Sequence, residues 1–216
     1  MLRLTIIVTL LFCLMNCSYS DDKPVDINKI NSQPEPDKDL QEKYEAEQKV
    51  KKLTCIFDNP DTSVSGISLR FAESARKVLD VRRLNSDTTY LFYSAGRNEI
   101  LSVKVHPGDG YSQVSIFQVK YAESPKLKAS SSRIKQFTTE KGIRLGLIKR
   151  DVIAKLGNCY SIIDSTDNRL MVEYRLKYPE DSKTKLLERQ SMPIYYATYK
   201  FQGDRLIEFE FGFEYP

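Results

Sequence analysis

The sequence predicts an α+β fold: two tandem units, each a short helix pair packed on one face of an antiparallel sheet of about four strands. Three observations lead to this prediction. Short amphipathic helical runs are followed by series of strand-like runs. That order occurs twice along the chain, as in a duplicated unit. The strand-like runs alternate apolar and polar residues, which is typical of a sheet covered on one side. The expected units are residues 51–125 and 126–216.

A short amphipathic run between Gly146 and Gly157 indicates the role of each helix, which is to cover one face of a sheet. Gly146 precedes this run and Gly157 follows it. An isolated helix of this length is marginal in water, so it needs a surface to pack on. Its apolar residues share one face: Leu147, Val152, Ile153 and Leu156. We expect Gly157 to end the helix and Gly146 to form a tight turn between two short helices.

A shift of 76 residues aligns the two units. The stretch GISL at 66–69 then falls on GIRL at 142–145, and Phe71 falls on Leu147. Strand patterns follow each helical run: 89–94, 99–105 and 112–122 in the first unit, and 160–164, 169–178, 193–201 and 205–216 in the second. In the last of these, phenylalanines alternate with Glu208 and Glu210, which predicts one apolar and one acidic face.

The pattern G-I-x-L-G, followed by V-x-x-x-L-G and a final F-x-F-G-F-type strand, resembles the BamE/SmpA family of small outer-membrane lipoproteins. It also resembles the repeats of the β-lactamase inhibitory protein (BLIP) family. The resemblance covers most of residues 53–216. The similarity to the BLIP repeats implies a tandem domain whose concave sheet grips a partner enzyme. Arg70 and Asp80 stand where the motif has glycines. Because the motif is structural, it bears on the fold rather than on an activity.

The amino terminus has the organisation of a secretory signal peptide over residues 1–16. Arg3 precedes an apolar run that ends at Met15 and is too short to span a bilayer. Cys17 resembles the modified cysteine of a bacterial lipobox, which predicts a diacylated, membrane-anchored protein of the cell envelope, in the outer membrane. The alternative is cleavage at Ser18-Tyr19-Ser20, which would release a soluble secreted protein.

Residues 17–50 are predicted to form a disordered tether, because they are polar and contain few aliphatic side chains. The 18–50 part has five lysines and nine acidic residues, and residues 51–216 have 27 basic and 20 acidic residues. A basic domain could approach anionic headgroups or an acidic partner, although charges of both signs also serve solubility. No arginine-rich run or basic–aromatic interleaving indicates nucleic-acid binding.

Two cysteines remain beyond the signal and lipobox region, Cys55 and Cys159. In an exported chain such a pair forms a disulfide more often than a catalytic site. The open alternative is two unpaired, buried cysteines.

The sequence argues against an enzyme. His106 is the single histidine, and a catalytic arrangement with Asp109 and Ser112 is conceivable. The intervening Pro-Gly-Asp-Gly is instead typical of a loop that joins two strands. One histidine also supplies too few ligands for zinc. We therefore expect no catalytic residue, metal or cofactor.

The remaining candidate is the polar face of the sheet. Tyrosine and arginine are enriched in binding hot spots, although ordinary solvated sheet faces also carry such residues. The candidate protein-binding residues are Glu173, Arg175, Tyr196, Lys200, Glu208 and Glu210. The predicted function is a non-enzymatic envelope lipoprotein that binds another envelope or periplasmic protein. The alternatives are a secreted inhibitor of a hydrolase and a purely structural envelope protein.

Overall fold

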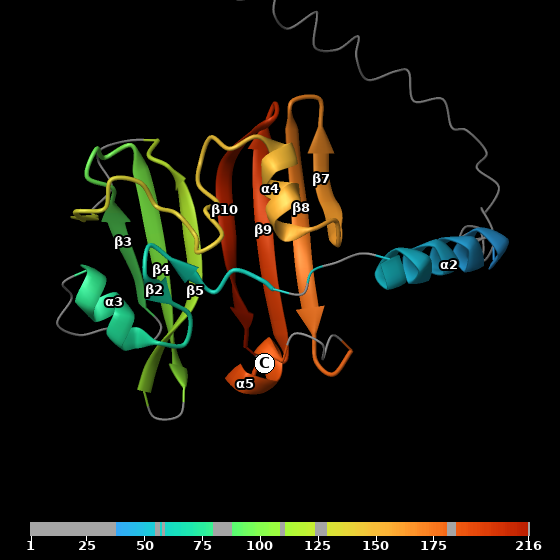
Figure 1. Cartoon of the computed structure of the whole chain (residues 1–216), viewed down its shortest axis with the longest axis horizontal. Helices are drawn as coiled ribbons and strands as arrows, with labels where there is room; N and C mark the ends of the chain where they lie inside the picture. The colour runs from blue at the N-terminus through green and yellow to red at the C-terminus, as the bar shows by residue number, and fades with distance from the viewer. Residues whose placement is uncertain are drawn as a thin grey trace, which may run out of the picture. The chain divides into compact units, whose positions relative to one another are not determined.

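The dominant feature of the chain is one eight-stranded sheet (Figure 1). The structure is a computed structural model that describes residues 38–54, 57, 59–79, 88–108, 111–123, 129–180 and 185–215. The strands are β3 (Thr88–Tyr93), β4 (Glu99–Gly108), β5 (Tyr111–Tyr121), β6 (Ser130–Ser131), β7 (Tyr160–Thr166), β8 (Arg169–Lys177), β9 (Ile194–Gln202) and β10 (Arg205–Glu214). Their order is β6-β3-β4-β5-β10-β9-β8-β7, and all neighbours are antiparallel except β3 and β6.

The pairing of β5 with β10 joins the two halves of this sheet. We call the described residues of 57–131 the first half and those of 132–215 the second half. Val119 lies opposite Phe209 and Phe117 opposite Phe211. The rings of Phe117 and Phe211 meet edge to face with centroids 5.6 Å apart. Aromatic side chains of this kind bury large apolar areas, so the joint between the halves is part of the core.

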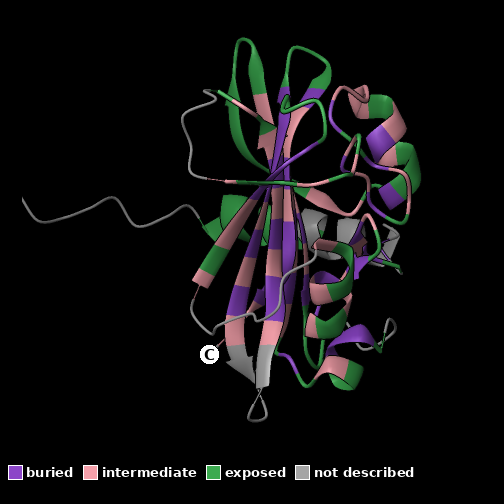
Figure 2. Cartoon of the chain, turned by 90° about the vertical axis from the view of Figure 1, so that its left-hand side faces the viewer, coloured by how far each residue is buried: buried purple, intermediate pink, exposed green. Residues whose placement is uncertain are grey.

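Three short helices lie on one side of the sheet (Figures 1 and 2). They are α3 (Ala72–Leu79), α4 (Lys149–Leu156) and α5 (Leu186–Gln190). A small hairpin of β1 (Ser63–Val64) and β2 (Ile67–Ser68) precedes α3. Leu156 is buried in the same apolar cluster as Phe209 and Phe211, whereas Leu79 of α3 is only partly buried against that cluster.

The predicted fold class, a tandem of two helix-pair units each on a sheet of about four strands, is wrong. The chain is mostly β, and the strands of both halves form one mixed sheet. In the described residues, each half has one eight-residue helix on the sheet, and α5 adds only five residues. Ile67 and Leu69 are both buried, as are Ile143 and Leu145. Apolar residues two positions apart fit extended chain rather than helix, which is why no second helix forms there.

Equivalent positions of the two halves nevertheless share backbone conformations. Gly66 and Gly142 have φ of 84° and 75°, and Arg70 and Gly146 have φ of 59° and 83°. These angles lie in the left-handed region, which glycine adopts at little cost and other residues avoid. Gly157, just after α4, has a φ of 89°, and its N–H donates to the carbonyl of Ile153. The expected end of the α4 helix is therefore at Gly157, whereas its first residue, Lys149, lies three residues after Gly146 and no helix directly precedes that glycine in the described residues.

The segment before β1 belongs to the first half but packs on the sheet of the second. The ring of Phe57 lies 4.7 Å from that of Tyr174 in β8. The hydroxyl of Tyr195 in β9 donates a hydrogen bond of 2.7 Å to the carbonyl of Asp61. Figure 1 shows this segment crossing the second half before it reaches β2. The halves are therefore interlocked as well as joined edge to edge.

A further helix, α2 (Lys38–Thr54), occupies the end of the segment that was expected to be disordered. Its described side chains, those of residues 38–46, are all exposed. Gln41 donates a 3.1 Å hydrogen bond to Glu45 one turn later, an interaction that supports a polar helix only modestly. The rest of the expected signal peptide and tether, including Cys17, lies outside the described residues.

Candidate functional site

The sheet brings all six sequence-predicted binding residues onto its helix-free side. Along one row across the strands, Glu210 of β10 lies opposite Thr198 of β9, and Thr198 opposite Glu173 of β8. In the neighbouring rows Glu208 pairs with Lys200, and Arg175 pairs with Tyr196. The intervening residues of each strand point into the core, so alternation places these six on the opposite face.

Tyr196 and Glu210 form the centre of this surface. The tyrosine hydroxyl donates a 2.8 Å hydrogen bond to Oε1 of Glu210. Partial burial raises the pKa of Tyr196 well above its usual range, and the carboxylate of Glu210 raises it further. Tyr196 is therefore a neutral hydrogen-bond donor at physiological pH. Tyrosine is one of the residues that are enriched in binding hot spots, and its hydrogen bond to Glu210 fixes the position of its ring on this surface.

Ion pairs surround this centre. The guanidinium of Arg175 contacts the carboxylates of Glu173, at 3.4 Å, and of Glu214. The ammonium of Lys200 lies 3.9 Å from Glu208, which also accepts a 2.8 Å hydrogen bond from the amide of Gln118. We call these eight residues the sheet face: Gln118, Glu173, Arg175, Tyr196, Lys200, Glu208, Glu210 and Glu214.

Glu214 and Gln118 were not among the sequence-predicted site residues. Glu214 continues the alternation that identified Glu208 and Glu210, so the pattern contained a signal for it. Gln118 lies in β5, and only the β5–β10 pairing, which places it opposite Glu210, brings it to this surface. No local pattern in the sequence indicated that pairing.

Gly212 marks a close contact at the edge of the sheet face. β5 has a bulge at this level, because its register with β4 shifts between Lys104 and Val105. A Cβ added at Gly212 would lie 2.2 Å from the carbonyl oxygen of Ser115. Backbone therefore occupies the space that a side chain would fill, and only glycine fits this position in β10.

The alternative catalytic arrangement gains no support from the residues that can be described. His106 lies on β4 opposite Gln113, and its ring centroid is 4.6 Å from that of Tyr215. Asp109 lies outside the described residues, as does the side chain of Ser112. Within the described ranges, no cluster of three His, Cys, Asp or Glu side chains has the arrangement of a metal site.

A buried polar cluster at the junction of the halves was missed at the sequence level. Asp61 is fully buried and accepts a 3.2 Å hydrogen bond from the Lys141 N–H, and its other carboxylate oxygen has no partner among the described residues. Burial raises the pKa of Asp61 from 3.8 to about 6, despite a hydrogen bond from Thr139 that lowers it. A second connection joins the same segments, because the carboxylate of Glu140 accepts hydrogen bonds from the N–H and the hydroxyl of Thr62. The aspartate comes from the first half and its partners from the second.

The structure has Cys159 in a disulfide bond. Cys159 directly precedes Tyr160, whose ring lies 5.8 Å from Tyr174, the residue that Phe57 contacts. Its predicted partner, Cys55, lies outside the described residues, so the pairing stays a prediction. The position of Phe57 does bring the chain just after Cys55 to this part of the sheet.

Among the helices that the structure describes, none is long and apolar enough to cross a membrane. Comparisons with protein-family models, with curated proteins and with solved structures find no match to this chain. The resemblance to BamE/SmpA lipoproteins and BLIP repeats therefore stays a hypothesis.

Proposed function

We propose that this chain is a non-enzymatic, exported lipoprotein of the cell envelope, anchored through Cys17, that binds another envelope or periplasmic protein through the sheet face. The observation that carries the proposal is the sheet face itself. It lies on the side of the sheet opposite α3, α4 and α5 (Figure 2). It combines a central tyrosine, an arginine and several carboxylates on paired strands.

The contacts within the sheet face favour binding over simple solvation. Arg175, Glu173, Lys200 and Glu208 keep only about a quarter to a third of their side-chain surface exposed: 31%, 22%, 30% and 28%. Long side chains held in this way have already lost much of their conformational entropy, so a partner has less ordering to impose. A surface fixed in advance on rigid strands is therefore suited to recognising one partner.

The resemblance to the inhibitor family suggests the same surface, because in that family the concave sheet is expected to hold the partner enzyme. If the protein is instead released by cleavage after Ser20, the sheet face suits an inhibitor of a secreted or periplasmic hydrolase. A purely structural envelope protein would need no discrete partner on this surface.

Site-specific photocrosslinking in intact cells tests the proposed surface. A benzoyl-phenylalanine placed at Tyr196 should give a discrete crosslinked species of higher mass. The control position is Glu73 on α3, an exposed residue on the helix side of the sheet. Crosslinking from Glu73 but not from Tyr196, or from neither, would contradict binding by the sheet face.

Intact mass and membrane fractionation test the anchor separately. The proposal requires loss of residues 1–16, a mass increment from acyl chains, and transfer to the soluble fraction on Cys17→Ser. An unmodified amino terminus at Asp21 would instead support the secreted alternative, whatever the crosslinking result.

A further inference from the structure

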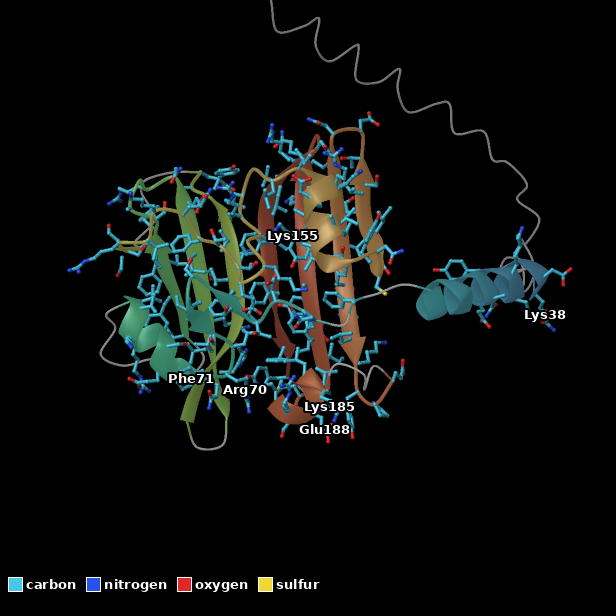
Figure 3. The ribbon with its side chains drawn as sticks, viewed as in Figure 1. Lys38, Arg70, Phe71, Lys155, Lys185 and Glu188 are labelled. Carbon is cyan, nitrogen blue, oxygen red and sulfur yellow. The ribbon has the colours of Figure 1, made fainter. Side chains whose placement is uncertain are left out.

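A cavity on the helix side of the sheet lies apart from the sheet face. It has a volume of about 410 Å³ and lies between the segment that leads into α3 and the helix α5. Figure 3 shows Phe71, at the end of that segment, and Glu188 of α5 at the same edge of the molecule. The volume falls within the range of pockets that hold small molecules. The described lining residues are Asn59, Pro60, Thr62, Ser68, Leu69, Phe71, Leu186, Arg189, Gln190 and Phe213.

Buried apolar residues form the inner wall of the cavity. Leu69, Leu186 and Phe213 line it and belong to the hydrophobic core. Pro60, which also lines it, is buried as well. Pockets for small molecules commonly combine such a wall with a few polar groups that fix the orientation of the ligand. A ligand of this cavity therefore needs an apolar surface of its own.

Phe71 adds an exposed aromatic ring to this lining. It is 58% exposed, whereas Leu147, at the equivalent position of the second half, packs against the core. The face of an aromatic ring carries a negative potential, so it attracts the partly positive C–H groups of a molecule that lies on it. The exposed ring is therefore suited to a ligand with a face that is rich in C–H groups.

Two residues with side-chain amides, Asn59 and Gln190, line the cavity beside the apolar wall. Asn59 is exposed and Gln190 is partly buried, and neither amide has a hydrogen-bond partner among the residues that the structure describes. Each amide offers an acceptor oxygen and a donor nitrogen side by side. Adjacent hydroxyl groups, which both donate and accept, complement this arrangement. A purely apolar ligand would displace water from the amides and leave them without partners, which costs free energy.

The polar part of the described lining is mostly uncharged. Besides the two amides it includes the hydroxyl residues Thr62 and Ser68. Arg189 is the one charged residue among the described lining residues, and its Nε donates a 3.2 Å hydrogen bond to the carbonyl of Lys185. The lining is therefore suited to uncharged hydrogen-bonding groups more than to an ion of either sign.

We propose that this cavity binds a neutral saccharide unit, with the C–H face of the sugar ring on Phe71 and hydroxyl or acetamido groups at the amides of Asn59 and Gln190. A sugar ring combines both required properties, because its C–H groups form an apolar face and the hydroxyls at its edge donate and accept hydrogen bonds. The site is independent of the function proposed for the sheet face, because it lies on the other side of the sheet.

Titration of the purified chain with two neutral trisaccharides tests this proposal. The probes are triacetylchitotriose, which carries acetamido groups, and maltotriose, which carries hydroxyls alone. Saturation-transfer difference NMR detects the bound sugar and shows which of its protons contact the protein. At least one probe should bind with a dissociation constant of about 1 mM or lower, with the strongest transfer to the C–H protons of one ring face. Transfer to neither sugar at about 10 mM would overturn the proposal.

Variants place the bound sugar in this cavity. Phe71→Ala should weaken binding by about tenfold, whereas Phe71→Tyr keeps an aromatic ring and should retain it. Asn59→Ala combined with Gln190→Ala should weaken binding by at least about tenfold, because two hydrogen bonds are lost. Unchanged binding in both Phe71→Ala and the double variant would overturn the site.

Two control variants remove the same kinds of side chain elsewhere. Ile162→Ala removes an exposed apolar side chain of β7, and Asn168→Ala removes an exposed amide between β7 and β8. Both should leave the titrations unchanged, and thermal unfolding shows whether each variant is folded. Binding that weakens as much in these controls as in the cavity variants would overturn the assignment to this cavity.

Discussion

The segments that lead into α3 and α4 share backbone conformations at equivalent positions but form different hydrogen bonds to the sheet. Both place left-handed residues at equivalent positions, yet the second half uses Gly146 where the first uses Arg70. In the second half, three backbone hydrogen bonds join residues 146–149 to residues 204–206. In the described part of the first half, the corresponding bond runs from the Arg70 N–H to the carbonyl of Val114.

The difference extends to the helices. Leu156 of α4 is 3% exposed, whereas Leu79 of α3 is only partly buried. The second half therefore fixes its helix firmly to the sheet, and the first half leaves the aromatic ring of Phe71 exposed at the position equivalent to Leu147. Two segments with similar backbone conformations can thus differ in burial. One packs its helix in the core, and the other leaves an apolar side chain exposed.

The largest expected effect is the loss of packing under α4. Leu156→Ala should lower the free energy of unfolding by about 2–5 kcal/mol, because it leaves a cavity in a close-packed core. Leu79→Ala should cost only about 1 kcal/mol, since less apolar surface is buried there. Urea denaturation of both variants measures the contrast. Equal losses would mean that the two helices are packed equally well.

A pH titration of stability tests the polar junction between the halves. Because the pKa of Asp61 is raised from 3.8 to about 6, the folded state binds a proton more readily than the unfolded state. Its contribution to stability is therefore full below about pH 4, is lost as pH rises through about 6, and changes little above about pH 7. The expected loss is about 2–3 kcal/mol.

Asp61→Asn is the matched variant for this titration, since it keeps the shape of the side chain and removes its ionisation. Relative to the variant, the parent should lose stability as the pH rises from about 4 to about 7. A difference that is constant over this range would contradict a raised pKa in the folded state.

A smaller effect should follow from exchanging the left-handed residues. Gly146→Ala should cost about 1–2 kcal/mol, because alanine avoids a φ of 83° and its Cβ would lie 3.3 Å from the hydroxyl of Tyr121. Arg70→Gly should change stability by no more than about 0.5 kcal/mol, since relief of strain is offset by the greater entropy of unfolded glycine. A large loss on Arg70→Gly would show that its side chain, rather than its backbone, holds the segment.

The smallest effect on stability is expected at the sheet face. Arg175→Ala should change the free energy of unfolding by less than about 1 kcal/mol, because its ion pairs are partly exposed. The same variant should weaken partner capture if the sheet face is the binding surface. A loss of several kcal/mol in stability would assign Arg175 to the fold instead.

The strands were predictable because their alternation is local. Seven of the eight strands of the large sheet lie within three residues of the predicted ranges at either end. The same alternation is enough to place Tyr196 and Glu210 on the polar face of the sheet. Helices were overpredicted, since a second short helix was expected on the other side of Gly146, where the spacing of Ile143 and Leu145 fits extended chain.

Contacts between distant parts of the chain were not predictable in this way. The pairing of β5 with β10 fuses what was expected to be two sheets, and it depends on residues far apart in the sequence, such as Gln118 and Glu210. The hydrogen bond between Asp61 and Lys141 likewise spans 80 residues. The periodicity of a single sequence predicts strands and turns, but it does not predict which strands pair or which turns contact each other.

The crossing of the segment before β1 over the second half has a consequence for how the chain acquires its structure. Phe57 is made early during synthesis, but its contacts with Tyr174 and Tyr195 need residues that are made much later. The first half therefore cannot complete its packing until most of the second has emerged. Contacts between such distant residues slow folding, because a long loop must close before they form. Truncation after β6 would remove the surface on which Phe57 packs, and the amino-terminal segment would then have no site in the fold.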